Sequence, residues 1–247
     1  MNKSVAYEHG GVELEGILAC DDSKGTGLRP GVLLIPEWWG LNDYVRGRAD
    51  AIAKLGYVAF AADMYGKIVT TDAKKASELA GQFYGKPIMA ERARAGFDQL
   101  AAHSLVDRAR VAAIGFCFGG TVCQALAYSG APLAGIVSFH GGLIQVPEGA
   151  ARRNSAKWLV CHGALDPMVQ KDQVDAFLQS ADAAKMDYQF NIYAGAVHAF
   201  SNPDADALAI SNGLKGIAYS PSAARRSWAD MKRFLNEIFE AAPTAAR

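Results

Sequence analysis

The chain has 247 residues, of which 51% are hydrophobic and 20% are charged. A chain of this length and apolar content can bury a sizeable core, which excludes an intrinsically disordered protein. Its 25 basic and 25 acidic residues cancel to zero net charge, which argues against a nucleic-acid-binding protein.

The first half of the chain alternates short apolar runs with segments of helical spacing. Two short strands around a Gly10-Gly11 turn form a hairpin signal at the start. Expected strands of this half cover residues 5–7, 12–18, 31–35, 57–61 and 110–114. Expected helices cover residues 44–55, 73–84 and 89–103, and Gly56 ends the first of them.

The second half continues the alternation, with strands expected over residues 133–139, 157–161 and 188–193. Helices are expected over residues 121–128, 170–184 and 223–239. Short apolar strands alternating with helices predict an α/β fold, with a mostly parallel sheet, helices on both faces and an antiparallel N-terminal hairpin. No repeat or Pro/Gly/Ser-rich linker divides the chain, so we expect one domain over residues 1–247. Reactive groups in such sheets lie beyond the carboxyl ends of the strands.

A cysteine flanked by glycines follows the predicted strand 110–114. Residues 115–119 read Gly-Phe-Cys-Phe-Gly, the G-x-C-x-G equivalent of a nucleophile elbow, whose sharp turn raises the central side chain above the sheet. The N-terminus of the next helix favours a thiolate, and the N–H of Phe118 is positioned to bind an oxyanion. We interpret Cys117 as a nucleophile. The alternative is a small buried side chain, since free cysteines are commonly buried.

A thiol nucleophile needs a base, and the base needs an orienting carboxylate. His198 follows the strand 188–193 and is the last of the five histidines, as the order nucleophile, acid, histidine requires. Asp166 follows the strand 157–161 and is the expected acid, although a turn-forming or helix-capping aspartate is the alternative. His140, at another strand end, is expected to line the pocket, whereas His162 is interpreted as structural.

Five segments together resemble the dienelactone hydrolase family of α/β-hydrolases. They are GVLLIPEWWG (31–40), GYVAFAADMYG (56–66), IGFCFGG (114–120), HGALDP (162–167) and GAVHAF (195–200). These segments occur in the family order and span most of the chain. A cysteine in the elbow combined with Pro-Glu after the preceding strand makes the resemblance specific.

The resemblance implies a Cys–His–Asp triad of Cys117, His198 and Asp166. It implies that Glu37 contacts the thiol and takes up its proton when substrate arrives; the alternative is an ordinary loop glutamate. The N–H of Trp38 is then the second oxyanion donor. The implied reaction is hydrolysis of a small ester or lactone through a thioester, with no metal or organic cofactor.

One position departs from the family pattern. Well-known members bind a substrate carboxylate with arginines, one of them four residues beyond the catalytic histidine, where this chain has Asn202. We therefore expect the family's catalytic residues to carry over, and we do not expect its dienelactone substrate to carry over with them. Asn202 and Trp39 are expected in the substrate pocket, although the Trp38-Trp39 pair is equally consistent with simple packing.

Two other classes of protein remain open. One is a redox or acyl-transfer protein that uses Cys117, with Cys123 as a second thiol, and the other is a non-catalytic binding module. The four cysteines form no CxxC pair, and we interpret them as free thiols of a cytoplasmic protein. No run approaches about 20 apolar residues and no signal peptide is evident, so no membrane partner is expected. A monomer or a small homo-oligomer is compatible with the sequence.

Overall fold

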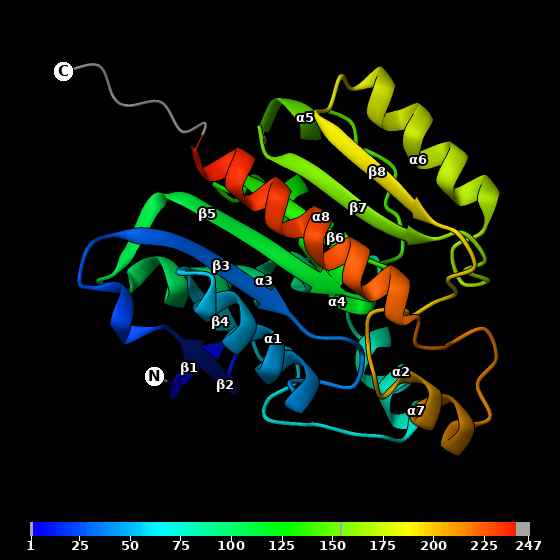
Figure 1. The fold of residues 1–247 in the computed structure, drawn as a ribbon, viewed down its shortest axis with the longest axis horizontal. Coiled ribbons are helices and arrows are strands. Elements are labelled where there is room, and N and C mark those ends of the chain that lie inside the picture. The colour runs from blue at the N-terminus through cyan, green and yellow to red at the C-terminus, as the bar shows by residue number, and fades with distance from the viewer. Residues whose placement is uncertain (1, 154, 241–247) are drawn as a thin grey trace.

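The predicted α/β architecture is confirmed by a computed structural model that describes residues 2–153 and 155–240. Within these residues one mixed sheet has the strand order β1-β2-β4-β3-β5-β6-β7-β8 (Figure 1). The strands are β1 (Asn2–His9), β2 (Val12–Ala19), β3 (Arg29–Ile35), β4 (Val58–Ala61), β5 (Val106–Phe116), β6 (Gly135–Phe139), β7 (Lys157–Gly163) and β8 (Tyr188–Tyr193).

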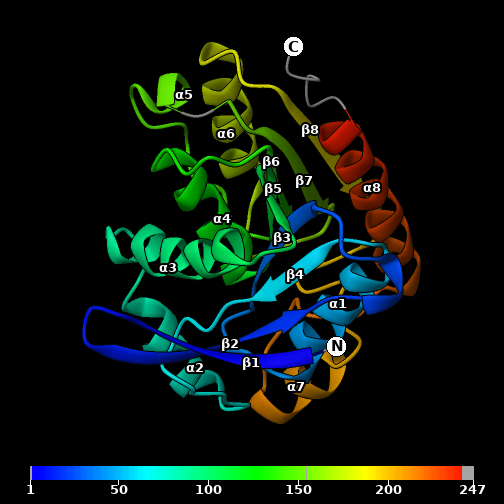
Figure 2. The ribbon, with the colours of Figure 1, turned by 90° about the vertical axis from the view of Figure 1, so that its left-hand side faces the viewer.

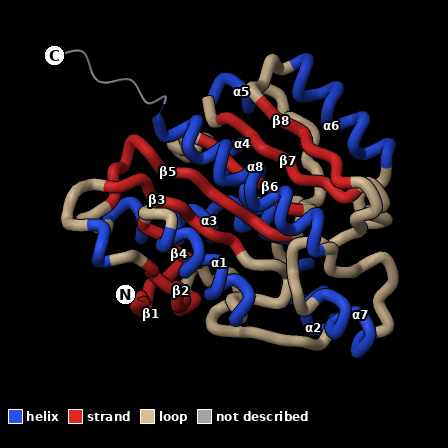
Figure 3. The backbone as a smooth tube through the Cα atoms, in the orientation of Figure 1, coloured by secondary structure: helices blue, strands red, loops and turns tan. Residues whose placement is uncertain are grey.

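The N-terminal hairpin forms the expected antiparallel end of the sheet. Strand β1 pairs with β2, and β2 pairs antiparallel with β4. All pairs from β4 to β8 across the sheet are parallel. The carboxyl ends of these strands therefore meet at one edge, where Figure 3 shows the loops beside α2 and α7.

Helices cover both faces of the sheet (Figure 2). One core lies beneath α2, α3, α4 and α6, and the other beneath α1 and α8. The helices are α1 (Asp43–Lys54), α2 (Ala73–Gly81), α3 (Ile88–Ala102), α4 (Phe118–Tyr128), α5 (Ala150–Arg153), α6 (Lys171–Ala183), α7 (Ala205–Asn212) and α8 (Pro221–Glu240), with a 3-10 turn at Asp22–Lys24.

Strand β3 shows why short apolar runs became central strands. Its residues Leu33 and Ile35 enter one core, and Val32 and Leu34 enter the other. Successive side chains of a strand point to opposite faces, so a strand covered on both sides needs an unbroken apolar run. Each such side chain contributes about 1.5–3 kcal/mol on burial.

Two short helices, α5 and α7, were absent from the sequence prediction. Helix α7 buries only Ala205 and Ala209 and leaves Ile210 83% exposed, so it has no apolar stripe to reveal it. Strand β5 also begins earlier than predicted, because Val106 pairs with Arg29 of β3. In the described part of the chain, no helix is both long and apolar enough to cross a membrane. Residues 241–247 lie outside the described residues.

Candidate active site

Cys117 stands at a tight turn between β5 and α4, with a backbone φ of 52°. A non-glycine residue in this region is strained and needs support from its surroundings. The two flanking glycines allow the turn, because a Cβ at Gly115 would collide with the backbone of Gly119. A Cβ at Gly119 would collide with the carbonyl oxygen of Ile35 at the end of β3. The elbow predicted from the sequence is therefore the geometry of this turn.

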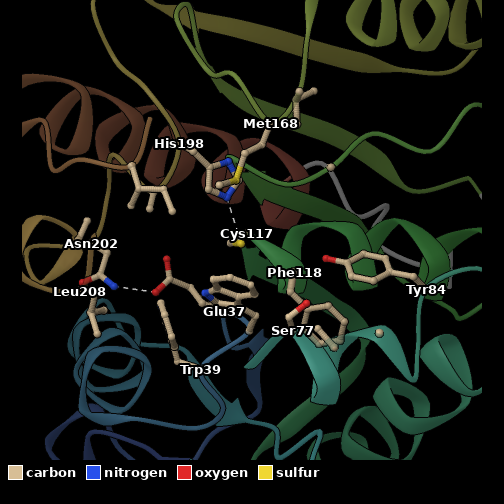
Figure 4. A pocket seen from close by; sticks show the side chains of 18 residues that line it. Glu37, Trp39, Ser77, Tyr84, Cys117, Phe118, Met168, His198, Asn202 and Leu208 are labelled. Carbon is tan, nitrogen blue, oxygen red and sulfur yellow. Dashed lines mark hydrogen bonds between the residues drawn. The ribbon is translucent and has the colours of Figure 1, made fainter. Parts of the chain in front are cut away.

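The structure brings Cys117, His198 and Asp166 together, although they follow three different strands. His198 Nε2 lies 3.1 Å from Cys117 Sγ (Figure 4). His198 Nδ1 lies 2.8 Å from Asp166 Oδ2. Asp166 and His198 are buried, and the cysteine is partly accessible. The other carboxylate oxygen, Asp166 Oδ1, accepts the backbone N–H of Met168 at 2.8 Å, which fixes the carboxylate plane.

The charges of this row determine the protonation of His198. Burial lowers the pKa of His198, but the Cys117 thiolate and the Asp166 carboxylate outweigh burial and raise it above its ordinary value. An imidazole between a thiol and a carboxylate is therefore stabilised in its charged form. The arrangement can hold a thiolate–imidazolium pair at the base of a cavity.

A cavity of about 380 Å³ opens over Cys117 and His198. Tyr84 and Leu208 lie on opposite sides of it, and Phe118 lies beside the cysteine (Figure 4). Trp38, Trp39 and Asn202 also line the cavity. No Lys or Arg is among its lining residues in the described chain. Such a cavity suits a small ligand that is largely apolar and carries no negative charge.

Glu37 follows β3 and is 1% exposed at the cavity wall. Its Oε2 accepts a hydrogen bond of 2.6 Å from the Asn202 side-chain amide. Burial raises the pKa of Glu37 to about 7, although the bond from Asn202 and the charge on His198 oppose the shift. We expected this carboxylate to contact the thiol; in the described residues it is hydrogen-bonded to Asn202, and no hydrogen bond joins it to Cys117.

His140 occupies a different place from the one expected. It is 1% exposed and lies behind the elbow, outside the residues that line the cavity. Its Nδ1 accepts the backbone N–H of Cys117 at 3.2 Å, and its Nε2 lies 2.7 Å from Ser201 Oγ. Ser201 also contacts Tyr44, whose hydroxyl is 2.8 Å away. Sequence reasoning missed Ser201 and Tyr44, because polar residues on a helix and in a loop carry no signal of a shared contact.

The redox alternative depends on Cys123 as a second thiol. Among the described cysteines none forms a disulfide, and Cys123 is completely buried on α4. Burial raises the pKa of the Cys123 thiol far above its ordinary value. In the described residues no group of three or more His, Cys, Asp or Glu side chains is arranged to hold a metal ion.

Known proteins resemble this chain over nearly its whole length. The sequence model of the dienelactone hydrolase family matches residues 14–239. A crystal structure of a dienelactone hydrolase-like promiscuous phosphotriesterase from metagenomic libraries is 41% identical, covers 97% of this chain and 98% of its own, and superimposes with a TM-score of 0.91. A putative dienelactone hydrolase from Klebsiella pneumoniae shares the fold at 20% identity, with a TM-score of 0.78 and coverage of 96% and 98%. A putative carboxymethylenebutenolidase from Saccharolobus solfataricus is 24% identical over 96% of this chain and 99% of its own.

Proposed function

The chain belongs to the dienelactone hydrolase family of α/β-hydrolases, and we propose that it hydrolyses small neutral carboxylic esters or lactones with Cys117 as nucleophile. The row of short contacts from Cys117 through His198 to Asp166 carries the proposal. A nucleophile bonded to a base, and a base bonded to a carboxylate, is the arrangement that acyl transfer requires.

In the proposed acylation step, the Cys117 thiolate attacks the ester carbonyl and forms a carbon–sulfur bond. The carbonyl oxygen becomes an oxyanion that accepts hydrogen bonds from the N–H groups of Phe118 and Trp38. Phe118 begins α4, where the first N–H groups have no partner within the helix. Removing one such donor typically costs about 3 kcal/mol of transition-state stabilisation. The carbon–oxygen bond then breaks, and protonated His198 gives its proton to the leaving oxygen.

Deacylation needs a water molecule in the place of the departed alcohol. Neutral His198 takes a proton from this water, which attacks the thioester carbonyl and releases the acid and the thiolate. The resulting imidazolium is stabilised by Asp166, 2.8 Å from its Nδ1. The cycle returns a thiolate–imidazolium pair and consumes one water.

The cavity supports a neutral substrate. A carboxylate on the substrate would meet no Lys or Arg among the described lining residues, and it would approach the buried carboxyl group of Glu37. Asn202 directs one of its two amide N–H groups to Glu37, and as a neutral side chain it supplies no charge to balance a substrate anion. Burying an unpaired negative charge is costly, which favours uncharged esters and lactones over their carboxylate-bearing analogues.

Neutral phosphotriesters are a second candidate substrate class. The solved structure that is 41% identical is described as a promiscuous phosphotriesterase. A phosphotriester is uncharged and presents a phosphoryl oxygen that the same N–H groups can bind. Release of p-nitrophenolate from diethyl p-nitrophenyl phosphate tests this candidate, because turnover supports it and a single stoichiometric release contradicts it.

Intact-mass measurement after rapid mixing with p-nitrophenyl acetate tests the main proposal. An acetyl adduct on the peptide containing Cys117 is expected, together with a burst of p-nitrophenolate. Cys117→Ala should abolish both, whereas Cys123→Ala, which changes a buried thiol on α4, should retain both. Turnover by Cys117→Ala would contradict the proposal. In a separate thiol titration under mild oxidant, the loss of two thiols per chain together would favour a redox protein.

A panel of matched esters tests the substrate class. Each neutral ester is paired with an analogue that carries a free carboxylate on its acyl group, and kcat/KM is compared within each pair. The neutral member should be preferred by at least about tenfold, the equivalent of roughly 1.4 kcal/mol.

We further propose a single domain, a cytoplasmic location and a monomer or small homo-oligomer, which size-exclusion chromatography and cell fractionation can test.

A further inference from the structure

A buried hydrogen-bond network lies directly behind the proposed nucleophile. His140 follows β6, the strand next to β5, and is itself held at a positive φ of 41°. Its Nδ1 accepts the backbone N–H of Cys117 at 3.2 Å, in addition to the 2.9 Å bond from that N–H to the Phe139 carbonyl. The histidine therefore contacts the strained residue of the elbow through its backbone and leaves the thiol free.

The second ring nitrogen extends the network to the loop that carries His198. Because His140 Nδ1 accepts an N–H, its Nε2 carries the proton and donates to Ser201 Oγ at 2.7 Å. Ser201 lies three residues beyond His198, and its hydroxyl also bonds that of Tyr44 at 2.8 Å. The Ser201 carbonyl accepts a hydrogen bond of 2.7 Å from Arg48.

His140 is uncharged in this setting. Burial lowers the pKa of His140 far below its ordinary value, and the positive charges of His198 and Arg48 act in the same direction. The Tyr44 hydroxyl stays protonated, because burial raises its pKa. If His140 Nδ1 carried a proton, it could not accept the N–H of Cys117, and the two hydrogens would repel each other. Replacing His140 by an uncharged side chain therefore changes geometry without removing a charge.

We propose that His140 is a positioning residue, which links the Cys117 backbone to the His198 loop through Ser201 and so sets the separation of thiol and imidazole. It does not line the cavity, so it acts on the reaction through the Cys117 backbone, through Ser201 and through its ring, whose centroid lies 5.4 Å from that of the His198 ring. The inference rests on the proposed role of Cys117 as nucleophile. The Cys117 backbone is held in an unfavourable region, and the hydrogen bonds that its N–H donates to His140 and to the Phe139 carbonyl help to maintain that conformation.

Three substitutions at residue 140 separate the two links. His140→Asn places an acceptor near the position of Nδ1 but is too short to reach Ser201, and asparagine tolerates a positive φ. His140→Gln can reach Ser201 but lacks the acceptor beside the Cys117 N–H. His140→Leu lacks both links. Ser201→Ala breaks the second link from the other side and leaves the histidine in place.

The readouts are kcat and KM for p-nitrophenyl acetate and the pH midpoint of Cys117 alkylation by iodoacetamide. His140→Leu should lower kcat by roughly 10- to 100-fold with KM within about twofold, because misplaced reacting groups affect the chemical step. Its alkylation midpoint should rise by about one pH unit, since the thiolate loses a well-placed imidazolium. His140→Asn should recover most of both properties, and Ser201→Ala should lower kcat by a few-fold.

Matched controls are His103→Asn, at the C-terminal end of α3, and Ser227→Ala, a buried serine on α8. Both should keep the wild-type kcat and alkylation midpoint. Wild-type values in all His140 and Ser201 variants would overturn the inference. The inference would also be overturned if the variants lost kcat only in proportion to the fraction of unfolded protein, while the pH midpoint of Cys117 alkylation stayed at the wild-type value. Failure of the proposed function is distinct, because it appears as turnover by Cys117→Ala, whereas alkylation needs no turnover.

Discussion

The Asn202 amide donates a hydrogen bond of 2.6 Å to the buried Glu37 carboxyl group, across 165 residues of sequence. This pair closes one wall of the cavity beside Cys117 and His198 (Figure 4). Asn202 supplies a neutral donor to Glu37, so the carboxyl group has a hydrogen-bond partner but, among the described residues, no counter-ion in direct contact. Its ionisation consequently depends on pH in the neutral range.

Glu37→Gln should change the pH dependence of stability. The pKa of Glu37 rises from 4.5 to about 7 on folding, so the folded protein keeps a proton that the unfolded chain releases between these values. The contribution of protonated Glu37 to the stability of the folded protein is present in full below about pH 4.5 and is lost as pH rises through 7. The free energy of unfolding of Glu37→Gln, taken relative to that of wild type, should therefore rise by about 3 kcal/mol between pH 4.5 and pH 8. Urea unfolding of both proteins at the two pH values measures this gain.

The matched control for Glu37→Gln is Glu78→Gln, which changes an exposed glutamate on α2. Its stability relative to wild type should vary by less than about 0.5 kcal/mol over the same range. If the free energy of unfolding of Glu37→Gln differed from that of wild type by the same amount at both pH values, Glu37 would have the same pKa in the folded and unfolded states.

Asp166→Asn should lower kcat by about 10²- to 10⁴-fold while the protein stays folded. The amide keeps an oxygen for the Met168 N–H but no longer supports an imidazolium at His198. Steady-state kinetics with p-nitrophenyl acetate provide the measurement. Asp175→Asn, which breaks an exposed pair with Lys171, is the control and should keep wild-type kcat. A loss of less than about fivefold in Asp166→Asn would argue against a role for this carboxylate in catalysis.

Gly119→Ala should destabilise the protein by about 1–3 kcal/mol and reduce kcat. Its methyl group would collide with the carbonyl oxygen of Ile35, and backbone cannot move as a side-chain end can. Gly47→Ala on α1 is the control, because nothing lies within 4 Å of the added Cβ. That change should stabilise the helix by roughly 1 kcal/mol. Urea unfolding measures both, and equal stability of the two variants would contradict this account of the elbow.

Leu208→Ala should shift the preference of the enzyme toward longer acyl groups. Leu208 lines the cavity from α7, and truncating it adds space to the cavity that opens over Cys117. The ratio of kcat/KM for p-nitrophenyl hexanoate to that for the acetate should rise by about 10-fold, the effect of one or two methylene contacts. Ile210→Ala, an exposed residue of the same helix, should leave the ratio unchanged. A falling ratio for Leu208→Ala would place the acyl group elsewhere.

The fold and the row of Cys117, His198 and Asp166 could be predicted because each residue lies in the turn or loop that follows a strand, after β5, β8 and β7 respectively. Parallel strands bring their carboxyl ends to one edge, so three local signals sufficed to predict one site. The glycines at 115 and 119 added a specific turn geometry. Short segments of sequence were therefore enough to predict which residues form the candidate site.

The contacts of Glu37 and His140 could not be predicted in the same way. Glu37 meets Asn202 across 165 residues, and His140 meets Ser201 across 61. Such contacts depend on the path of loops over the sheet, which leaves no periodic pattern in the sequence. Helix α7 was missed for a related reason, because two alanines are its only buried residues.

The proposed reacting groups and the cavity-lining side chains of α2 and α7 come from separate stretches of the chain. The first group occupies tight turns after β5, β7 and β8, whereas Ser77, Ala80 and Leu208 belong to α2 and α7. Combinatorial libraries confined to residues 73–81 and 205–212 should therefore diversify selectivity while preserving turnover. Directed evolution toward new leaving groups would instead have to alter the turns, where most changes should inactivate the enzyme.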